Sequence, residues 1–289
     1  MDELEQCVGD AESFLSTHWR QGPVVLRPPA PPVDLLSLPD VYGLIDDGLL
    51  SGPYLRLFTA EGRVPAERFC PPRLVSGEPV AGYANPDAVY ELLHTGGATL
   101  LLRYIDQWHY GVRDFAAGLG ERMGRRVEAF FFLSSRRPTA PHRDDADVLA
   151  VQVSGAKRWL IYPGPADGDW ATGPLPADPG APILETVLRR GEVLYVPRGF
   201  AHAAVTESDT PSAHLTLTIR EAETEHLTTA TRGMLATGLQ LPARPLTEAT
   251  LTATAAALIA HFRARLDAIA PEAVVAAARA IAQPHRSEG

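Results

Sequence analysis

The chain has 289 residues, of which 45% are hydrophobic and 21% charged, so it can bury the core of one large or two modest domains. Its formal net charge of −9, from 26 basic and 35 acidic residues, opposes binding to the phosphate backbone of nucleic acids. Cys7 and Cys70 show no CxxC spacing, which excludes a zinc ribbon and a disulfide scaffold. No basic n-region with an apolar core opens the chain, and no apolar run approaches the ~20 residues of a membrane span, so we expect a soluble cytoplasmic protein.

The first 125 residues predict an N-terminal elaboration of short helices and strands. Residues 10–20 form an amphipathic pattern, and residues 87–94 and 110–123 are helical patterns closed by Gly96-Gly97 and Gly124. Alternating or apolar runs predict strands at 23–27, 54–58 and 98–104.

The central part predicts an all-β core from about residue 126 to 220. Five short apolar or alternating segments, separated by turn residues such as Ser154-Gly155 and Arg190-Gly191, lie at 127–134, 147–153, 157–162, 192–196 and 213–219. Many short strands of this kind are typical of a barrel or jelly roll. The stretch 163–182 is rich in Pro, Gly and Asp and predicts a loop at the rim of the barrel.

The residues after Glu221 predict a small helical unit, so we expect domains at 1–220 and 221–289. Residues 247–270 and 272–282 have helical patterns. An apolar stripe on the first of these helices needs a partner surface, which is either the chain's own barrel or a second copy of the chain; its members are Leu251, Leu258, Phe262, Leu266 and Ile269.

A candidate metal centre comes from two separate segments. His142 and Asp144 are two residues apart, so on an extended strand both side chains project to one face. A later strand and tight turn, Gly191 to Phe200, lead to His202. Two imidazoles and one carboxylate form the facial triad of non-haem iron, which leaves positions open for a 2-oxo acid and for dioxygen. An HxD tripeptide alone is weak support, and the later strand, turn and histidine strengthen it.

These motifs also resemble a known family. Residues 141–148 and 152–159, followed by 191–202 and 212–216, are similar to the signature of JmjC-type cupin oxygenases, and especially of the ribosomal oxygenases, which hydroxylate Arg or His in ribosomal proteins. The similarity extends more loosely over residues 10–220. It implies a mainly β fold with flanking helices around a double-stranded β-helix (jelly roll) core. It also implies Fe(II), 2-oxoglutarate and O2 as cofactor and co-substrates, with His142, Asp144 and His202 as metal ligands and catalytic residues.

The resemblance further implies that Lys157 pairs with the distal carboxylate of 2-oxoglutarate, whereas without it a solvated hairpin lysine is the simpler interpretation. Ser212 and Thr216 lie on the polar face of an alternating strand and become candidate cofactor contacts if that face points into the barrel. His214, on the same face, is expected to be structural or to support the ligands.

Two departures from the family concern the substrate. Phe131 stands where those enzymes carry a tyrosine, and the tail is short for both a dimerisation unit and a winged helix. We therefore expect hydroxylation of an Arg- or His-like side chain in a protein or a shorter peptide, and a homodimer through the C-terminal helices. Acidic residues near the site suggest a basic substrate, although they are also ordinary loop acids: Asp145, Asp147, Asp167, Asp169 and Asp178. Two other functions stay open, a cupin metalloenzyme that does not use 2-oxoglutarate and a non-catalytic β-barrel interaction module.

Overall fold

The computed structural model describes residues 1–134, 138–175, 179–206 and 211–282. These residues divide into two compact units. The first contains Met1–Met123 and Val127–Arg220, and the second contains Gly124–Arg126 together with the chain from Glu221 onward.

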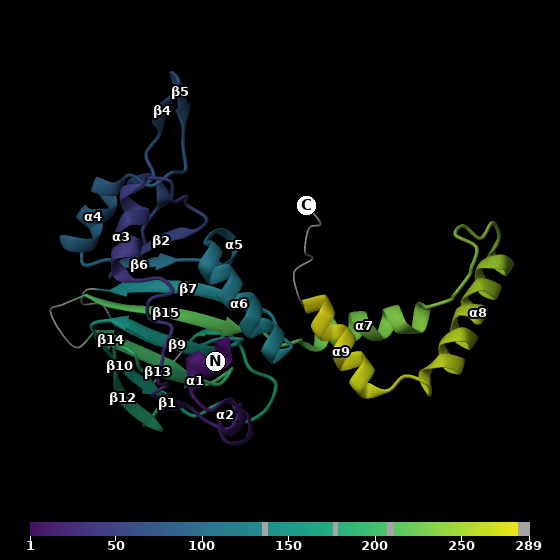
Figure 1. Cartoon of the computed structure of the whole chain (residues 1–289). Coiled ribbons are helices and arrows are strands. Elements are labelled where there is room, and N and C mark those ends of the chain that lie inside the picture. The colour runs from purple at the N-terminus through teal and green to yellow at the C-terminus, as the bar shows by residue number, and fades with distance from the viewer. Residues whose placement is uncertain (135–137, 176–178, 207–210, 283–289) are drawn as a thin grey trace. The chain divides into compact units, whose positions relative to one another are not determined.

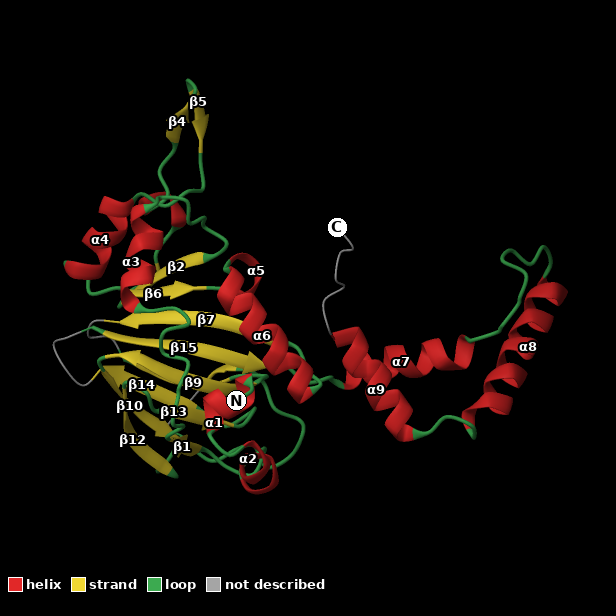
Figure 2. Ribbon diagram, viewed as in Figure 1, coloured by secondary structure: helices red, strands yellow, loops and turns green. Residues whose placement is uncertain are grey.

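The first unit is built on a large antiparallel sheet (Figures 1 and 2). Its strands are β1 (Val24–Leu26), β2 (Leu55–Thr59), β3 (Gly62–Arg63), β6 (Thr99–Leu102), β7 (Val127–Ser134), β9 (Asp147–Ser154), β13 (Val193–Val196) and β15 (Ser212–Ile219). They are ordered β1-β13-β9-β15-β7-β6-β2-β3, so β15 lies between the two other long strands, β9 and β7. The strands expected at 127–134, 147–153 and 213–219 therefore form the centre of one sheet.

A second antiparallel sheet faces the inner side of the first. Its strands are β8 (Thr139–Arg143), β10 (Ala156–Ile161), β11 (Gly173–Pro174), β12 (Leu184–Arg189) and β14 (His202–Thr206), in the order β11-β8-β14-β10-β12. A buried apolar cluster joins the two sheets and includes Val148 and Ala150 of the large sheet with Trp159 and Ala204 of the small one. A separate hairpin consists of β4 (Arg73–Val75) and β5 (Glu78–Val80).

Helices cover the outer face of the large sheet. They are α1 (Glu3–Val8), α2 (Ala11–Thr17), α3 (Leu38–Asp46), the 3-10 turn η1 (Ala66–Arg68), α4 (Pro86–His94), α5 (Ile105–Trp108) and α6 (Tyr110–Met123). The side chains of Asp2, Ser37 and Asn85 cap α1, α3 and α4. Each accepts a hydrogen bond from a backbone N–H group in the first turn that has no partner within the helix. Leu215 and Leu217 of β15 share a buried cluster with α6, so the polar residues that alternate with them face the second sheet.

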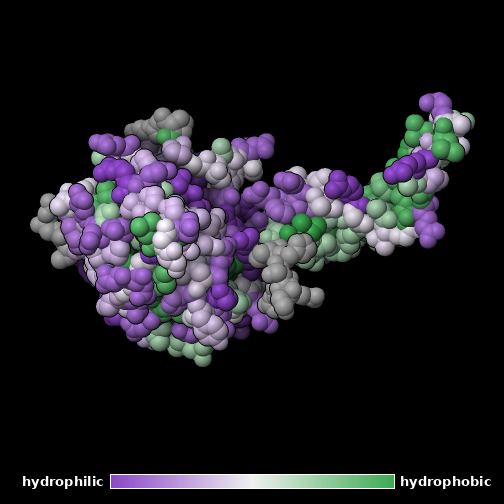
Figure 3. Space-filling view, turned by 90° about the horizontal axis from the view of Figure 1, so that it is seen from above, coloured by the Kyte–Doolittle hydropathy of each residue, from purple (hydrophilic) through white to green (hydrophobic). Residues whose placement is uncertain are grey.

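The second unit consists of α7 (Thr224–Ala236), α8 (Glu248–Leu266) and α9 (Pro271–Ala282). The helices α7 and α9 bury Ala230 and Ala278, and Glu221 pairs with both Arg125 and Arg279. The helix α8 buries none of its 19 residues. Figure 3 shows hydrophobic side chains at the surface of α8, where Leu251 and Leu266 are more than half exposed. None of the described helices is both long and apolar enough to cross a membrane.

Candidate metal centre and cofactor cavity

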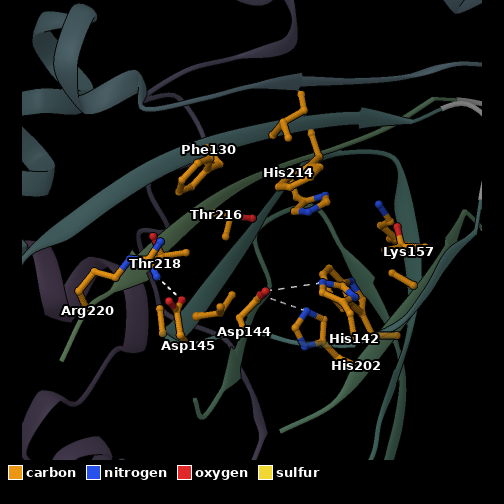
Figure 4. A pocket seen from close by; sticks show the side chains of 17 residues that line it. Phe130, His142, Asp144, Asp145, Lys157, His202, His214, Thr216, Thr218 and Arg220 are labelled. Atoms are coloured by element: carbon orange, nitrogen blue, oxygen red, sulfur yellow. Dashed lines mark hydrogen bonds and ion pairs between the residues drawn. The ribbon is translucent and has the colours of Figure 1, made fainter. Parts of the chain in front are cut away.

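The three predicted ligands meet at neighbouring strands of the small sheet. His142 on β8 and His202, the first residue of β14, are directly paired across the sheet, and Asp144 follows the end of β8. The Nε2 atom of His142 lies 3.8 Å from one carboxylate oxygen of Asp144, and the Nε2 atom of His202 lies 3.5 Å from the other. One ligand atom from each residue lies within 4.8 Å of the others. Figure 4 shows the three side chains pointing toward one another.

Backbone carbonyl groups fix the orientation of both imidazole rings. The Nδ1 atom of His142 lies 3.0 Å from the carbonyl oxygen of Ala140, and that of His202 lies 3.3 Å from the carbonyl oxygen of Phe200. A carbonyl oxygen only accepts, so each Nδ1 carries the proton and each Nε2 lone pair is free to bind a metal. Because the donor set is two imidazole Nε2 atoms and one carboxylate, it fits a divalent first-row metal such as Fe(II).

The protonation state of His202 also suits a ligand. Burial, together with the neighbouring ring of His142, lowers the pKa of His202 to about 4, although Asp144 acts in the opposite direction. The imidazole is therefore neutral at physiological pH, and a metal need not displace a proton from it.

A cavity of about 230 Å³ opens beside the triad. In the view of Figure 4, Lys157 and Arg220 lie toward opposite ends of it, with the triad between them. Phe130, Thr216 and Thr218 are among the other side chains on its wall. The cavity therefore has a buried, positively charged end at Lys157 and a second end at Arg220, where the surrounding charges differ.

Lys157 supplies the cation at the buried end. Its side chain on β10 is 2% exposed, and no carboxylate or carbonyl partner is found for it in the part of the chain that the structure describes. The nearest recorded contact is its Nζ atom 5.9 Å from the ring of Trp159. Burial lowers the pKa of Lys157 to about 8. An unpaired buried ammonium group is unfavourable unless an anion joins it, so the site fits the distal carboxylate of a bound dicarboxylate.

Lys157 is also the only lysine of the chain, whose other 25 basic residues are arginines. Trp159 lies two residues later on the same strand and also lines the cavity, as strand alternation predicts. The next residue, Arg158, points to the other face and pairs with Glu185.

The structure separates the two predicted contacts on β15. Thr216 lines the cavity, but Ser212 does not: its hydroxyl accepts a 2.8 Å hydrogen bond from the side-chain amide of Gln152. Ser212 is fully buried in that contact, which favours a structural role, and its contact with the cofactor stays a prediction.

His214 lies on the cavity wall, where only a structural or supporting role was expected. Its ring stacks on Phe132, with centroids 5.0 Å apart, and meets Trp159 edge to face. Its buried Nδ1 atom has no hydrogen-bond partner among the described residues. Burial, with Lys157 and His202 nearby, holds the pKa of His214 well below its usual range, so the ring is neutral. It presents a polar group to the cavity beside Lys157.

Arg220 marks the other end of the cavity. Its guanidinium group pairs with the buried Glu128, 2.9 Å away, and with the partly exposed Asp145. Arg220 was not among the site residues predicted from the sequence. The signal was present, because the inward-facing alternation from His214 through Thr216 and Thr218 reaches Arg220 after one more step.

The acidic residues expected at the rim have different positions. Asp147 is 0% exposed and accepts hydrogen bonds from Arg20 and Tyr195, so it cannot meet a substrate, and that expectation is corrected. Asp145 is paired with Arg220. Asp167 and Asp169 are exposed in the loop after β10, and Asp178 lies outside the described residues.

Comparison with protein families and curated proteins supports the resemblance seen in the motifs. Residues 113–227 match the family model of the JmjC domain. Over 149 residues the chain is 34% identical to the bifunctional lysine-specific demethylase and histidyl-hydroxylase NO66 of Drosophila simulans, and over 150 residues it is 33% identical to human ribosomal oxygenase 1. These alignments cover 49% and 50% of the chain. They cover only 18% of the fly protein and 23% of the human protein.

Solved structures show the same fold over a longer range. The structure of Escherichia coli ycfD aligns with a TM-score of 0.57 over 92% of this chain and 69% of its own, at 19% identity. A complex of the E. coli ribosomal oxygenase YcfD with cobalt and 2-oxoglutarate aligns with a TM-score of 0.55 over 91% of this chain and 67% of its own, at 20% identity. The chain is therefore similar to JmjC domains over residues 113–227 and to the ribosomal oxygenases in sequence over about half its length, and it shares the fold of the solved structures over nearly all of it.

Proposed function

We propose that the chain is a 2-oxoglutarate-dependent non-haem iron oxygenase that hydroxylates an amino-acid side chain in a protein or peptide. The observation that carries the proposal is the combination of the triad His142, Asp144 and His202 with a buried lysine on the wall of the same cavity that has no acidic partner among the described residues. The two facing antiparallel sheets are consistent with the double-stranded β-helix expected from the motifs.

The triad and the buried end of the cavity have separate tasks in this proposal. The triad holds Fe(II), and Lys157 binds the distal carboxylate of 2-oxoglutarate, with Thr216 and His214 as polar neighbours. Bound iron with 2-oxoglutarate and O2 supplies oxidative decarboxylation to succinate and CO2, which places one oxygen atom on the substrate. The protein orients the co-substrate and the target C–H bond around the metal and keeps the buried end of the cavity free of bulk water.

We propose an Arg- or His-like target side chain. The names of the relatives include a histidyl-hydroxylase and ribosomal oxygenases, which supports a protein substrate. The net charge of −9 and the exposed Asp167 and Asp169 are compatible with a basic partner. The burial of Asp147 and the pairing of Asp145 remove the two acids nearest the triad from that argument.

The two alternative functions explain the cavity less well. A cupin metalloenzyme that does not use 2-oxoglutarate has no need of a buried ammonium group at Lys157. A non-catalytic interaction module has no need of two imidazole rings whose Nε2 atoms converge on a carboxylate.

We also propose that residues 221–289 form a unit that mediates homodimerisation. Leu251 and Leu266 of α8 are 53% and 57% exposed, and the other members of the predicted stripe are not buried either. Contiguous exposed apolar side chains mark interaction surfaces. A cytoplasmic location remains a prediction, to which the two buried, unpaired thiols Cys7 and Cys70 are suited.

Oxygen-dependent succinate formation tests the proposed function. The purified chain with Fe(II) and 2-oxoglutarate should convert the co-substrate slowly without a substrate, and faster with one. A chain that binds a divalent metal and 2-oxoglutarate but forms no succinate under oxygen, alone or with peptide substrates, would show that the site is not an oxygenase centre.

A further inference from the structure

The inner face of the large sheet continues past the cavity onto its outer strands. Leu101 of β6 lines the cavity and is paired with Arg56 of β2 across the sheet. Arg103 lies two residues after Leu101, and Arg63 of β3 is paired with Phe58, two residues after Arg56. Paired residues and residues two apart project to the same face, so three arginines share the face that carries the cavity. We call Arg56, Arg63 and Arg103 the arginine patch.

Burial along these strands supports this assignment of faces. Leu55 and Leu57 of β2 and Leu100 and Leu102 of β6 are fully buried in the core beneath the helices. Arg56, Leu101 and Arg103 are only partly buried, and Arg63 is exposed. The patch is therefore accessible from the side of the sheet on which the cavity lies.

No carboxylate neutralises the patch within the described part of the chain. Arg158, Arg190 and Arg220 each form an ion pair with an acidic side chain, but no such pair is found for the three patch residues. The guanidinium group of Arg103 donates to the carbonyl oxygen of Pro53 and to the hydroxyl of Tyr104. The Nε atom of Arg56 is buried without a hydrogen-bond partner among the described residues, and burial, together with the positive charges of Arg103 and Arg63, lowers the pKa of Arg56.

Aromatic contacts connect the patch to the cavity. The guanidinium group of Arg103 lies 4.8 Å from the ring centre of Tyr104, and this ring lies 5.2 Å from that of Phe130, which lines the cavity. Tyr104 has a left-handed backbone (φ 50°), a conformation that is unfavourable for a tyrosine and often occurs at binding sites. The patch and the cavity are therefore parts of one continuous surface.

We propose that the arginine patch binds acidic side chains of the polypeptide substrate, on one side of the residue whose side chain enters the cavity. Guanidinium groups bind carboxylates through paired, charge-assisted hydrogen bonds, and three unpaired arginines repel one another until an anion joins them. The proposal rests on the proposed function in one respect, that the substrate is a polypeptide.

The sheet fixes the spacing that such a substrate needs. Three strand intervals separate β15, on the cavity wall, from β2, which carries Arg56. At about 4.8 Å per interval they span about 14 Å. An extended peptide covers that distance in about four residues. We expect the acidic residues about three to five positions from the target residue.

A polypeptide fits this surface better than a nucleic acid does. The net charge of −9 opposes a long phosphodiester chain, whereas three arginines suffice for one or two carboxylates. An acidic flank is also compatible with a basic or imidazole target side chain, because that side chain enters the cavity and the flank does not.

Selection from a peptide display library tests the proposal without catalysis. The library has a fixed central histidine or arginine and randomised flanks, and the bait is the full chain loaded with Mn(II) and N-oxalylglycine, a 2-oxoglutarate analogue that is not turned over. We expect enrichment of Asp and Glu on one flank, at about three to five positions from the centre. Selected peptides should bind at least about tenfold more tightly than the same peptides with Gln in place of the acids, and less tightly as salt rises.

Arginine variants connect that preference to the patch. Arg56→Gln and Arg103→Gln should each weaken binding of the acidic peptides by about fivefold or more and leave the Gln-substituted peptides unaffected. Arg232→Gln removes the same charge from exposed α7 and should change nothing. Unchanged Mn(II) and N-oxalylglycine affinities show that the variants are folded.

Three results would overturn the proposal. They are enrichment of basic or uncharged flanks, acidic enrichment that survives both patch substitutions, and displacement of the selected peptides by a single-stranded RNA that binds more tightly than they do. Failure of the proposed function is a separate result, since it appears as absent succinate formation while peptide binding stays measurable.

Discussion

The backbone N–H of Gly199 donates a 3.0 Å hydrogen bond to the carbonyl oxygen of Asp144. This bond joins the turn after β13, which leads to His202, to the carboxylate ligand from the end of β8. The two ligand-bearing segments lie 58 residues apart in sequence, from Asp144 to His202, and the turn brings them together. Gly199 has φ +79°, a conformation that side chains other than that of glycine disfavour.

Gly199→Ala should therefore loosen the metal centre. A Cβ atom at this position would lie 3.1 Å from the ring of Pro165 and 3.1 Å from Trp170. We expect a loss of roughly 1–3 kcal/mol of stability and a Mn(II) affinity about tenfold lower, measured by denaturation and calorimetry. Gly168→Ala is the control, because Gly168 lies in the loop that contains Pro165 and Trp170 but has no atom within 4 Å of an added Cβ. Equal effects of the two substitutions would rule out a special role for this turn.

The faces of the two sheets that line the cavity were predictable from the sequence because they depend on alternation. The same period of two that placed His142 and Asp144 together also placed the polar residues of β15 inward and Lys157 opposite Arg158. It did not distinguish Ser212 from His214. Whether a polar side chain lines the cavity or pairs within the wall depends on Gln152, a residue of another strand.

Other elements were missed because their local signals are weak. Pro138 and Pro141 weaken the strand pattern of β8 in the sequence. The strand β14 consists mainly of small residues after His202 and shows no clear alternation. Asp147 appeared to be a rim acid because its partner, Arg20, is 127 positions away in the chain. The arginine patch depends on the pairing of β2 with β6, which no local pattern reveals.

Asp144→Ala should abolish metal binding while leaving the fold intact. It removes the only anionic ligand, so we expect the Mn(II) affinity to fall by more than about 100-fold and succinate formation to cease. His202→Ala should behave in the same way. Asp145→Ala is the neighbouring control, because Asp145 pairs with Arg220 and is not among the ligands. Near-normal metal affinity of the Asp144 variant would disprove the assigned triad.

Lys157→Met should stabilise the chain without co-substrate and abolish 2-oxoglutarate binding. Holding the pKa of Lys157 at about 8 rather than 10.5 destabilises the fold by roughly 3 kcal/mol below pH 8, and this penalty disappears as the pH rises towards 10.5. We therefore expect the variant to unfold at higher denaturant concentration at pH 7. Its 2-oxoglutarate affinity should fall by about 30-fold or more. Arg158→Met, on the opposite face, should leave that affinity unchanged.

The single lysine makes a direct measurement possible. In protein labelled with 15N-lysine, one side-chain amine signal reports on Lys157 alone. Its pKa should rise from about 8 when 2-oxoglutarate binds, because a nearby carboxylate favours the charged form. A pKa that does not change at saturating 2-oxoglutarate would place the distal carboxylate elsewhere.

Tyr195→Phe should weaken the fold but not the chemistry. The buried hydroxyl donates to Asp147 over 2.8 Å and accepts from the backbone N–H of Arg20 over 2.9 Å. Its loss leaves buried polar groups unpaired, at a cost of roughly 1–3 kcal/mol in the free energy of unfolding. Tyr110→Phe is a control, since Tyr110 is 79% exposed. The peptide selectivity and salt dependence of the Tyr195 variant should match those of the unmodified chain. A change in the selectivity or in the salt dependence would indicate that Asp147 does influence substrate binding.

The chain should form a homodimer through the exposed apolar residues of α8. Light scattering should give twice the chain mass of 31.1 kDa at high micromolar concentration, because none of the apolar residues of α8 is buried within the described chain. The double substitution Leu251→Glu and Leu266→Glu places charges on that surface and should yield the monomer mass. Thr252→Glu, at another exposed position of the same helix, should leave the dimer intact. A strictly monomeric mass for the unmodified chain would remove the dimer proposal. A dimer that survives the double substitution would move its interface to another surface.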